Sequence, residues 1–196
     1  MIEFLIRRFV PDWQQVQRTD VRERYGTLAA AVGILSNIFL CIIKGLIGLF
    51  SGSIAVTADA VNNLSDAGSS VITLLAFKIA GKPADEEHPY GHARMEYISG
   101  MAVSFIIILL GLELMGSSFE KILHPEEVGV SALTYLVLIV SIAVKLWQGM
   151  FNRSLGKRIS SEALQATAAD SLNDVFSTGA VLLSTLVYQF TAIPID

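Results

Sequence analysis

The sequence predicts an all-α membrane protein, built as a bundle of transmembrane helices. Hydrophobic residues make up 53% of its 196 residues, and only 16% are charged. A soluble domain carries about 25% charged residues, so this composition favours an integral membrane protein. Five apolar segments are also long enough to cross the roughly 30 Å hydrocarbon layer of a bilayer as helices.

Residues 1–25 are predicted to form a cytoplasmic, interfacial segment ahead of the first span. Their apolar run "FLI" is too short for the hydrophobic region of a signal peptide. The segment also carries five arginines: Arg7, Arg8, Arg18, Arg22 and Arg24. This pattern is typical of a segment in the headgroup region, with Phe4, Leu5 and Trp13 facing lipid.

The transmembrane domain is predicted to cover residues 26–196. Its five spans are expected near residues 26–50, 54–80, 95–121, 129–151 and 162–190. Glycine, proline and clustered charge separate them in "SGS", "GKPADEEHPYGHAR", "HPEEVGVS" and "NRSLGKRISSE". The chain stops soon after the fifth span, which suggests a fragment or a protein completed by something outside this chain.

The distribution of positive charge predicts the orientation. Eleven of the 14 Lys and Arg residues fall on the side of the N-terminus, the second loop and the fourth loop. The other side holds Lys121, while Lys44 and Lys145 lie within spans. Cytoplasmic loops carry an excess of Lys and Arg, so we expect a multi-pass protein of the cell membrane with a cytoplasmic N-terminus.

Two pairs of polar residues repeat at one spacing in two of the predicted spans. Asn62 and Asp66 are four residues apart in the second span, and Asp170 and Asp174 in the fifth. Residues four apart share one face of a helix. In addition, "NNLSDAGSS" from Asn62 aligns without gaps on "DSLNDVFST" from Asp170. The repeat predicts two antiparallel helices that present four oxygen-bearing side chains to one point.

The predicted depth of these side chains favours a cation site. Each pair lies roughly at the bilayer midplane, by the rise of about 1.5 Å per residue in a helix. Ionisable side chains there are costly and normally mark ion or proton pathways. The alternative is that the aspartates are protonated, or paired with Lys44 and Lys145. Asp59 is expected to line the exit path or to pair with a lysine.

The loop "PADEEHPYGHARMEY" is the second unusual feature. Asp85, His88 and His92 have a spacing that could bind a metal ion at the cytoplasmic mouth. An equally weighted alternative is a rigid loop, whose two histidines hydrogen-bond to backbone and start the third span. The sequence leaves both alternatives open.

Taken together, these motifs resemble the cation diffusion facilitator family. The resemblance rests on the four polar residues in the spans, on "PADEEHPYGHARMEY" and on "FNRSLGKRISSEAL". It implies a homodimeric antiporter that exports divalent metal ions in exchange for protons. Family members have six spans and a cytoplasmic C-terminal metal-binding domain; the sixth span and that domain are absent from this chain.

The resemblance also implies the transport site. Asn62, Asp66, Asp170 and Asp174 would hold the transported ion, and the loop residues Asp85, His88 and His92 would form the family's loop site. Zinc-exporting branches usually have histidine in place of Asp170, and often of Asn62. The Asn-Asp-Asp-Asp set is similar to that of bacterial manganese exporters.

Ligand chemistry independently favours the same class of ion. Imidazole suits zinc, whereas carboxylate and carbonyl oxygens suit manganese, magnesium and calcium. Oxygen ligands do not separate manganese from magnesium or iron(II), so the choice of manganese rests on the resemblance. Together they predict a Mn²⁺/H⁺ antiporter in the lipid bilayer, with no resident cofactor, no nucleic-acid partner and no enzymatic activity. Efflux of Zn²⁺, Fe²⁺ or Cd²⁺ by the same fold is the alternative within this class.

Two rivals come from other classes of protein. An intramembrane aspartyl protease also buries two aspartates, but it needs one on each of two helices and a glycine beside the second. Asp170 and Asp174 share a helix, and neither follows glycine. A membrane sensor or anchor subunit that does not transport is the other rival, and the missing sixth span keeps it open.

Overall fold

The structure is a computed structural model that describes residues 2–51, 54–86, 88–123 and 132–191. Throughout these ranges the regular elements are α-helices, so the predicted all-α fold class is confirmed. The helices are α1 (Ile2–Phe9), α2 (Thr19–Ser51), α3 (Ile54–Ala80), α4 (Met95–Leu123), α5 (Ala132–Ile159) and α6 (Glu162–Thr191).

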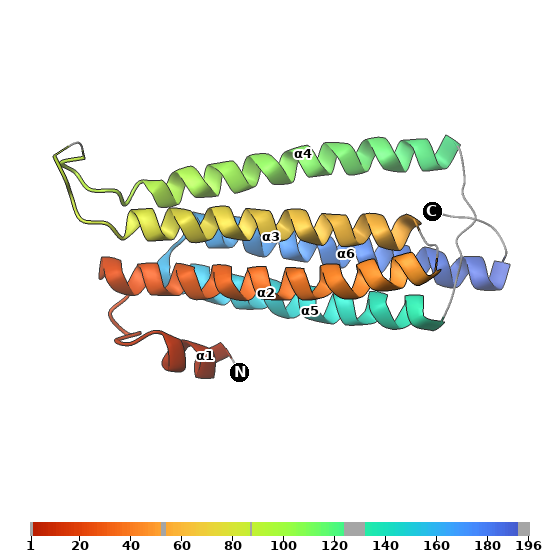
Figure 1. The fold of residues 1–196 in the computed structure, drawn as a ribbon, viewed down its shortest axis with the longest axis horizontal. Helices are drawn as coiled ribbons and strands as arrows, with labels where there is room; N and C mark the ends of the chain where they lie inside the picture. Colours follow the sequence, from red (N-terminus) through yellow and green to blue (C-terminus); the bar gives the residue numbers. More distant parts are fainter. Residues whose placement is uncertain (1, 52–53, 87, 124–131, 192–196) are drawn as a thin grey trace.

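Five long helices run side by side, and the short α1 lies outside them near one end (Figure 1). The most extensive packing joins α2 to α3 and α5 to α6, and α4 lies against α3 and α6. The two helix pairs contact each other mainly through α2 and α5, whereas α3 and α6 touch only sparsely. The start of α2, the α3–α4 loop and the α5–α6 turn share the end predicted to be cytoplasmic.

Apolar side chains cover the outside of the bundle, and polar ones lie within it. Leu35 and Leu49 of α2 are 70% and 74% exposed, and Phe105 of α4 is 61% exposed. In contrast, Asn37 and Gln148 are 1% exposed. This distribution is the reverse of a soluble protein and matches a molecule whose surroundings are lipid.

By length and composition, three helices in the described part of the chain are able to cross a membrane. They are Thr19–Phe50, Met95–Glu113 and Ala132–Ile159. The molecule is therefore a membrane-embedded helix bundle. Helices α3 and α6 have the required length but hold the aspartates, which lower their hydropathy. Their assignment as the second and fifth spans stays a prediction.

The N-terminal segment packs on the bundle more closely than the sequence predicted. Ile6 and Val10 are fully buried in an apolar cluster with residues of α2, α5 and α6. Leu5 and Trp13 pack against this cluster, so the prediction that they face lipid was wrong. Phe4, at 69% exposure, does point away from the protein. One face of the segment packs on the bundle, and Phe4 is exposed on another. The segment can therefore lie in the headgroup region and still hold the helix ends together.

Helix α5 continues from Asn152 to Ile159, through the segment predicted to be a loop. The prediction gave too much weight to its charged residues. Leu155 and Ile159 are both buried, so this stretch is an amphipathic helix whose charged side chains face away from the core. The turn to α6 contains Ser160, at φ 49°, and Ser161, whose hydroxyl accepts the Leu164 N–H at 3.3 Å and caps α6.

Charged side chains connect four helices at the same end of the bundle. The Arg22 guanidinium of α2 donates to both Glu96 carboxylate oxygens of α4, at 2.9 and 3.1 Å, and to the Ile159 carbonyl of α5. Arg158 of α5 pairs with Glu3 of α1. These contacts tie α1, α2, α4 and α5 to one another at this end of the bundle.

The close packing of α2 on α3 is testable at Gly26. A Cβ atom at this position would lie 2.0 Å from Cγ of the buried Phe77 ring. We expect Gly26→Ala to lower the free energy of unfolding by about 1–3 kcal/mol, because the ring has to shift. The measurement is the midpoint of thermal unfolding in detergent. Gly111→Ala is the control, since a Cβ there meets no atom within 4 Å. Equal midpoints for the two variants would contradict this packing.

Candidate metal centre

Helices α3 and α6 bring their aspartates to the same depth of the bundle. Asp66 lies 12 residues after Ile54, the start of α3, and Asp174 lies 12 residues after Glu162, the start of α6. The two helices run in opposite directions and begin at opposite ends. At 1.5 Å per residue, Asp66 lies about 18 Å from the end where α3 begins, and Asp174 lies about 18 Å from the other end, where α6 begins. The two aspartates therefore meet near the middle of the bundle.

Three of the four residues predicted to form the site come together. One carboxylate oxygen from each of Asp66, Asp170 and Asp174 lies within 4.8 Å of the other two. Asp66 is 4% exposed, and the other two are half-buried. At 4.8 Å, two ionised carboxylates repel by about 3 kcal/mol for an effective dielectric constant of about 20. The ionised cluster therefore requires a cation.

Asn62, the fourth predicted residue, lies one helical turn before Asp66 and is half-buried. The spacing of four puts it on the face of α3 that carries Asp66. Its position is consistent with a place beside the carboxylates, but its role as a ligand stays a prediction.

Lys145 of α5 supplies a positive charge to the cluster. Its Nζ lies 2.5 Å from Asp66 Oδ2 and 2.6 Å from Asp174 Oδ2, and its side chain is 3% exposed. Among the described residues, no ion pair joins a lysine or arginine to Asp170. The ammonium therefore bridges one carboxylate from α3 and one from α6.

Lys44, the other lysine within the bundle, pairs with Asp59 at 2.8 Å. Asp59 was predicted either to line the exit path or to pair with a lysine, and in the structure it pairs with a lysine. This contact is separate from the cluster, because Asp59 lies nearly two helical turns before Asp66 on α3. The alternative that lysines pair with the buried aspartates of the cluster is correct for Lys145, which contacts Asp66 and Asp174. Lys44 pairs with Asp59 instead.

Several buried polar atoms of the bundle have no hydrogen-bond partner among the described residues. They include the side-chain oxygens of Asn37, Asn63 and Ser141. Ser141 is one turn before Lys145 on the same face of α5. Buried polar atoms normally have a partner, so these oxygens are available to a group that enters or moves.

The loop between α3 and α4 holds a second cluster, formed by Asp85, His88 and His92. Each residue offers one ligand atom within 4.8 Å of the other two. Asp85 Oδ1 lies 3.1 Å from His88 Nδ1, and Asp85 Oδ2 lies 3.6 Å from His92 Nε2. Asp85 Oδ1 also accepts the His88 backbone N–H at 2.6 Å, and this hydrogen bond holds the pKa of Asp85 below its usual range.

The geometry of this loop is compatible with both of its predicted roles. The backbone turns tightly, with Gly91 N–H donating to the His88 carbonyl, and Met95 N–H at the start of α4 donating to the His92 carbonyl. The two imidazole rings lie 4.4 Å apart, and both face Asp85. The histidine side chains thus meet a carboxylate, an arrangement that serves a metal site as well as a rigid turn.

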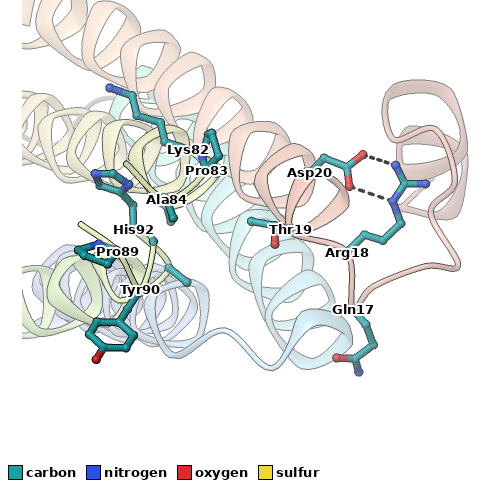
Figure 2. A pocket seen from close by; sticks show the side chains of 14 residues that line it. Gln17, Arg18, Thr19, Asp20, Lys82, Pro83, Ala84, Pro89, Tyr90 and His92 are labelled. Carbon is teal, nitrogen blue, oxygen red and sulfur yellow. Dashed lines mark hydrogen bonds and ion pairs between the residues drawn. The ribbon is translucent and has the colours of Figure 1, made fainter. Parts of the chain in front are cut away.

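A pocket of about 740 Å³ opens beside this loop. Figure 2 shows the Arg18–Asp20 ion pair on one side of it, and His92, Pro89 and Tyr90 on the other. The pocket lies at the end of the bundle where α2 begins and α3 ends, away from the carboxylate cluster. It gives water and ions access to the loop cluster.

Lys145 contacts the site directly, whereas the sequence analysis considered it only as an alternative partner of the aspartates. A lysine alone in an apolar span is a signal, because such residues are rare and normally face a partner inside the bundle. The sequence could not indicate which aspartate it meets, since α5 and α3 are far apart along the chain.

Comparisons with known proteins match this architecture. A profile of the cation efflux transmembrane domain matches residues 30–196. The manganese efflux system protein MneS of Bacillus subtilis is 34% identical over 179 residues, which are 89% of this chain and 62% of MneS. An uncharacterised transporter of Methanocaldococcus jannaschii is also 34% identical, over 81% of this chain and 56% of its own length.

The magnetosome protein MamB of Magnetospirillum gryphiswaldense is 30% identical over 77% of this chain and 51% of MamB. The chain thus spans between half and two thirds of the length of these curated relatives. Because the family profile covers most of the chain, and the relatives match over most of it too, the protein belongs to the cation diffusion facilitator family.

Proposed function

We propose that the protein exports manganese(II) from the cytoplasm in exchange for protons. The observation that carries this proposal is the cluster of Asp66, Asp170 and Asp174, which gathers three carboxylates within 4.8 Å of one another at mid-bundle. With the Asn62 amide oxygen as a neutral fourth ligand, the ion meets oxygen ligands and no nitrogen or sulfur ligand. Carboxylate and carbonyl oxygens suit manganese, magnesium and calcium.

The choice of manganese among these ions draws on two further observations. Manganese(II) is the weakest binder of the divalent transition series, so proteins select it by ligand type and geometry. Omitting imidazole weakens the site most for competitors such as zinc. One of the relatives, MneS, is named as a manganese efflux system protein. Efflux of Zn²⁺, Fe²⁺ or Cd²⁺ is the alternative within the same mechanism.

The proposed mechanism is alternating access around the cluster. With the site open to the cytoplasm, the carboxylates release protons and bind the metal ion, because a cation favours their charged form. With the site open to the outside, protons displace the ion. The protein then returns to the cytoplasm-facing state with protonated, metal-free carboxylates, since desolvation favours their neutral form.

The setting of this reaction follows from charge and family. The excess of Lys and Arg at the end that carries the α3–α4 loop favours a cytoplasmic N-terminus in the plasma membrane. A homodimer is implied by membership of the family. A sensor or anchor subunit without transport activity is the competing function, and it predicts metal binding without flux.

We further propose that Asp85, His88 and His92 bind a second metal ion at the cytoplasmic mouth. The three ligand atoms converge within 4.8 Å, and the pocket beside His92 leaves the cluster accessible. Imidazole ligands suit zinc and later transition metals more than manganese. The two sites therefore differ in the ions they are expected to prefer.

Asp66→Ala tests the transport site. We expect it to reduce manganese flux to background in proteoliposomes of the full-length protein under an imposed pH gradient, with zinc and magnesium measured alongside. Lys145 retains Asp174 as a partner in this variant, so the bundle is expected to fold. Ser65→Ala, at an exposed neighbour on α3, is the control and should transport normally.

Flux that persists in Asp66→Ala would overturn the assignment of the site. Zinc flux in place of manganese flux would keep the site but overturn its proposed selectivity. Metal binding without flux of any ion, from a folded full-length protein, would favour the sensor or anchor.

Asp170→His tests selectivity. Asp170 is half-buried, and exchanging it breaks no described ion pair, so the variant adds imidazole with little other disturbance. We expect the ratio of zinc to manganese transport to rise by about tenfold or more, because imidazole prefers zinc. Asn173→His is the control, since Asn173 is exposed one turn further along α6. An unchanged ratio would show that this position does not select the ion.

His88→Ala tests the loop site. We expect zinc titration calorimetry of the wild-type protein to resolve a second class of site that this variant lacks, because two ligands bind more weakly than three. Tyr90→Ala is the control, since Tyr90 lies in the same loop, is 99% exposed and is not in the cluster. Identical titrations for wild type and His88→Ala would leave the loop a structural turn.

A further inference from the structure

Lys145 holds the place of a cation among the proposed ligands. Its Nζ contacts Asp66 of α3 at 2.5 Å and Asp174 of α6 at 2.6 Å. We propose that the Lys145 ammonium is a built-in cation that occupies the transport site until a divalent ion displaces it, and so excludes monovalent ions. This inference rests on the proposed function, because it assigns a role to the same site.

The ammonium and a metal ion cannot share these carboxylates. A divalent ion bound by oxygen ligands lies within about 2.0–2.6 Å of them. The ammonium already lies 2.5 and 2.6 Å from Asp66 Oδ2 and Asp174 Oδ2, so the two cations would meet at the same oxygens. They would repel strongly at that separation, in a site that is 3% exposed at Lys145. Metal binding therefore requires the ammonium to leave.

The valence of the incoming ion decides whether this exchange is favourable. Sodium or potassium would replace one positive charge by another and gain no Coulomb energy. A divalent ion replaces one charge by two beside three carboxylates, and it gains attraction to all of them. The ammonium is also covalently tethered, so its effective concentration at the site is high and a monovalent ion competes poorly.

The structure offers the displaced side chain a place to go. Lysine has a flexible four-carbon stem, so rotation about its bonds moves the ammonium by several ångströms. Ser141, one turn away on the same face of α5, has a buried hydroxyl oxygen without a hydrogen-bond partner among the described residues. The displacement needs a change of rotamer and no change in the charge of the lysine.

The test is manganese binding to purified full-length protein by calorimetry, in wild type and Lys145→Met. Each titration is run in sodium chloride and in choline chloride at the same ionic strength of about 0.15 M, so that screening is equal. Choline is too large to enter a site that holds an ammonium group. We expect Lys145→Met to bind manganese about tenfold more tightly or better in choline, because a close competing charge is lost.

Sodium provides the sharper readout. In Lys145→Met we expect sodium to weaken manganese binding relative to choline, whereas wild type should bind equally in both salts. Lys44→Met is the matched control: Lys44 is equally buried, pairs with Asp59 and lies outside the cluster, so its affinity and salt response should equal wild type. Unchanged or weaker binding by folded Lys145→Met would overturn the proposal, and tighter binding without a sodium effect would overturn its selectivity part.

Lys145→Arg keeps the experiment decisive if Lys145→Met does not fold, because it retains the charge. A guanidinium binds carboxylates through two parallel hydrogen bonds and is harder to displace, so we expect weaker manganese binding and no sodium effect. Tighter binding would overturn the proposal. Failure of the proposed function gives a different result. In that case wild type and Asp66→Ala would show the same manganese binding, and the Lys145 variants would not alter this comparison.

Discussion

The need to place a cation beside three carboxylates in the middle of the bundle governs the rest of this structure. Ionised aspartates within 4.8 Å of each other in a nonpolar environment repel, and the Lys145 ammonium offsets that repulsion. Helices α3 and α6 carry this cluster, and α2 packs on α3 and α5 on α6. Polar side chains turn inward, and leucine and phenylalanine turn to lipid.

The two helices that carry the carboxylate cluster, α3 and α6, are not among those in the described part of the chain whose composition meets that of a membrane span. Helices α2, α4 and α5 meet the composition expected of a membrane span, whereas α3 and α6 hold aspartates, asparagine and serine within their length. Packing compensates for that polarity: α2 covers α3 closely, with Gly26 against the Phe77 ring and Gly33 against Ser70. The hydropathy of α3 and α6 is lowered by the aspartates and other polar residues that they carry.

Local patterns in the sequence predicted the helices and the three carboxylates, because spacing along one helix determines which face a side chain takes. The pairs Asn62–Asp66 and Asp170–Asp174 are such patterns. The similar depth of the two pairs in their helices predicted that their carboxylates lie close together. Contacts between distant segments were not predictable in the same way. Lys145 meets Asp66 across 79 residues, and Leu5 packs against a cluster formed by residues of α2, α5 and α6, because α1 folds back on the bundle.

The carboxylate cluster contains residues from both helix pairs of the bundle, α2–α3 and α5–α6. Asp66 belongs to the α2–α3 pair, whereas Asp170, Asp174 and Lys145 belong to the α5–α6 pair. The sparse contact between α3 and α6 leaves the Lys145–Asp66 ion pair as a direct link across that boundary. A rocking motion of one pair against the other would change the distances among the carboxylates. Any cation in the cluster therefore holds the two pairs together, and exchanging one cation for another acts on the site and on the contact between the pairs at once.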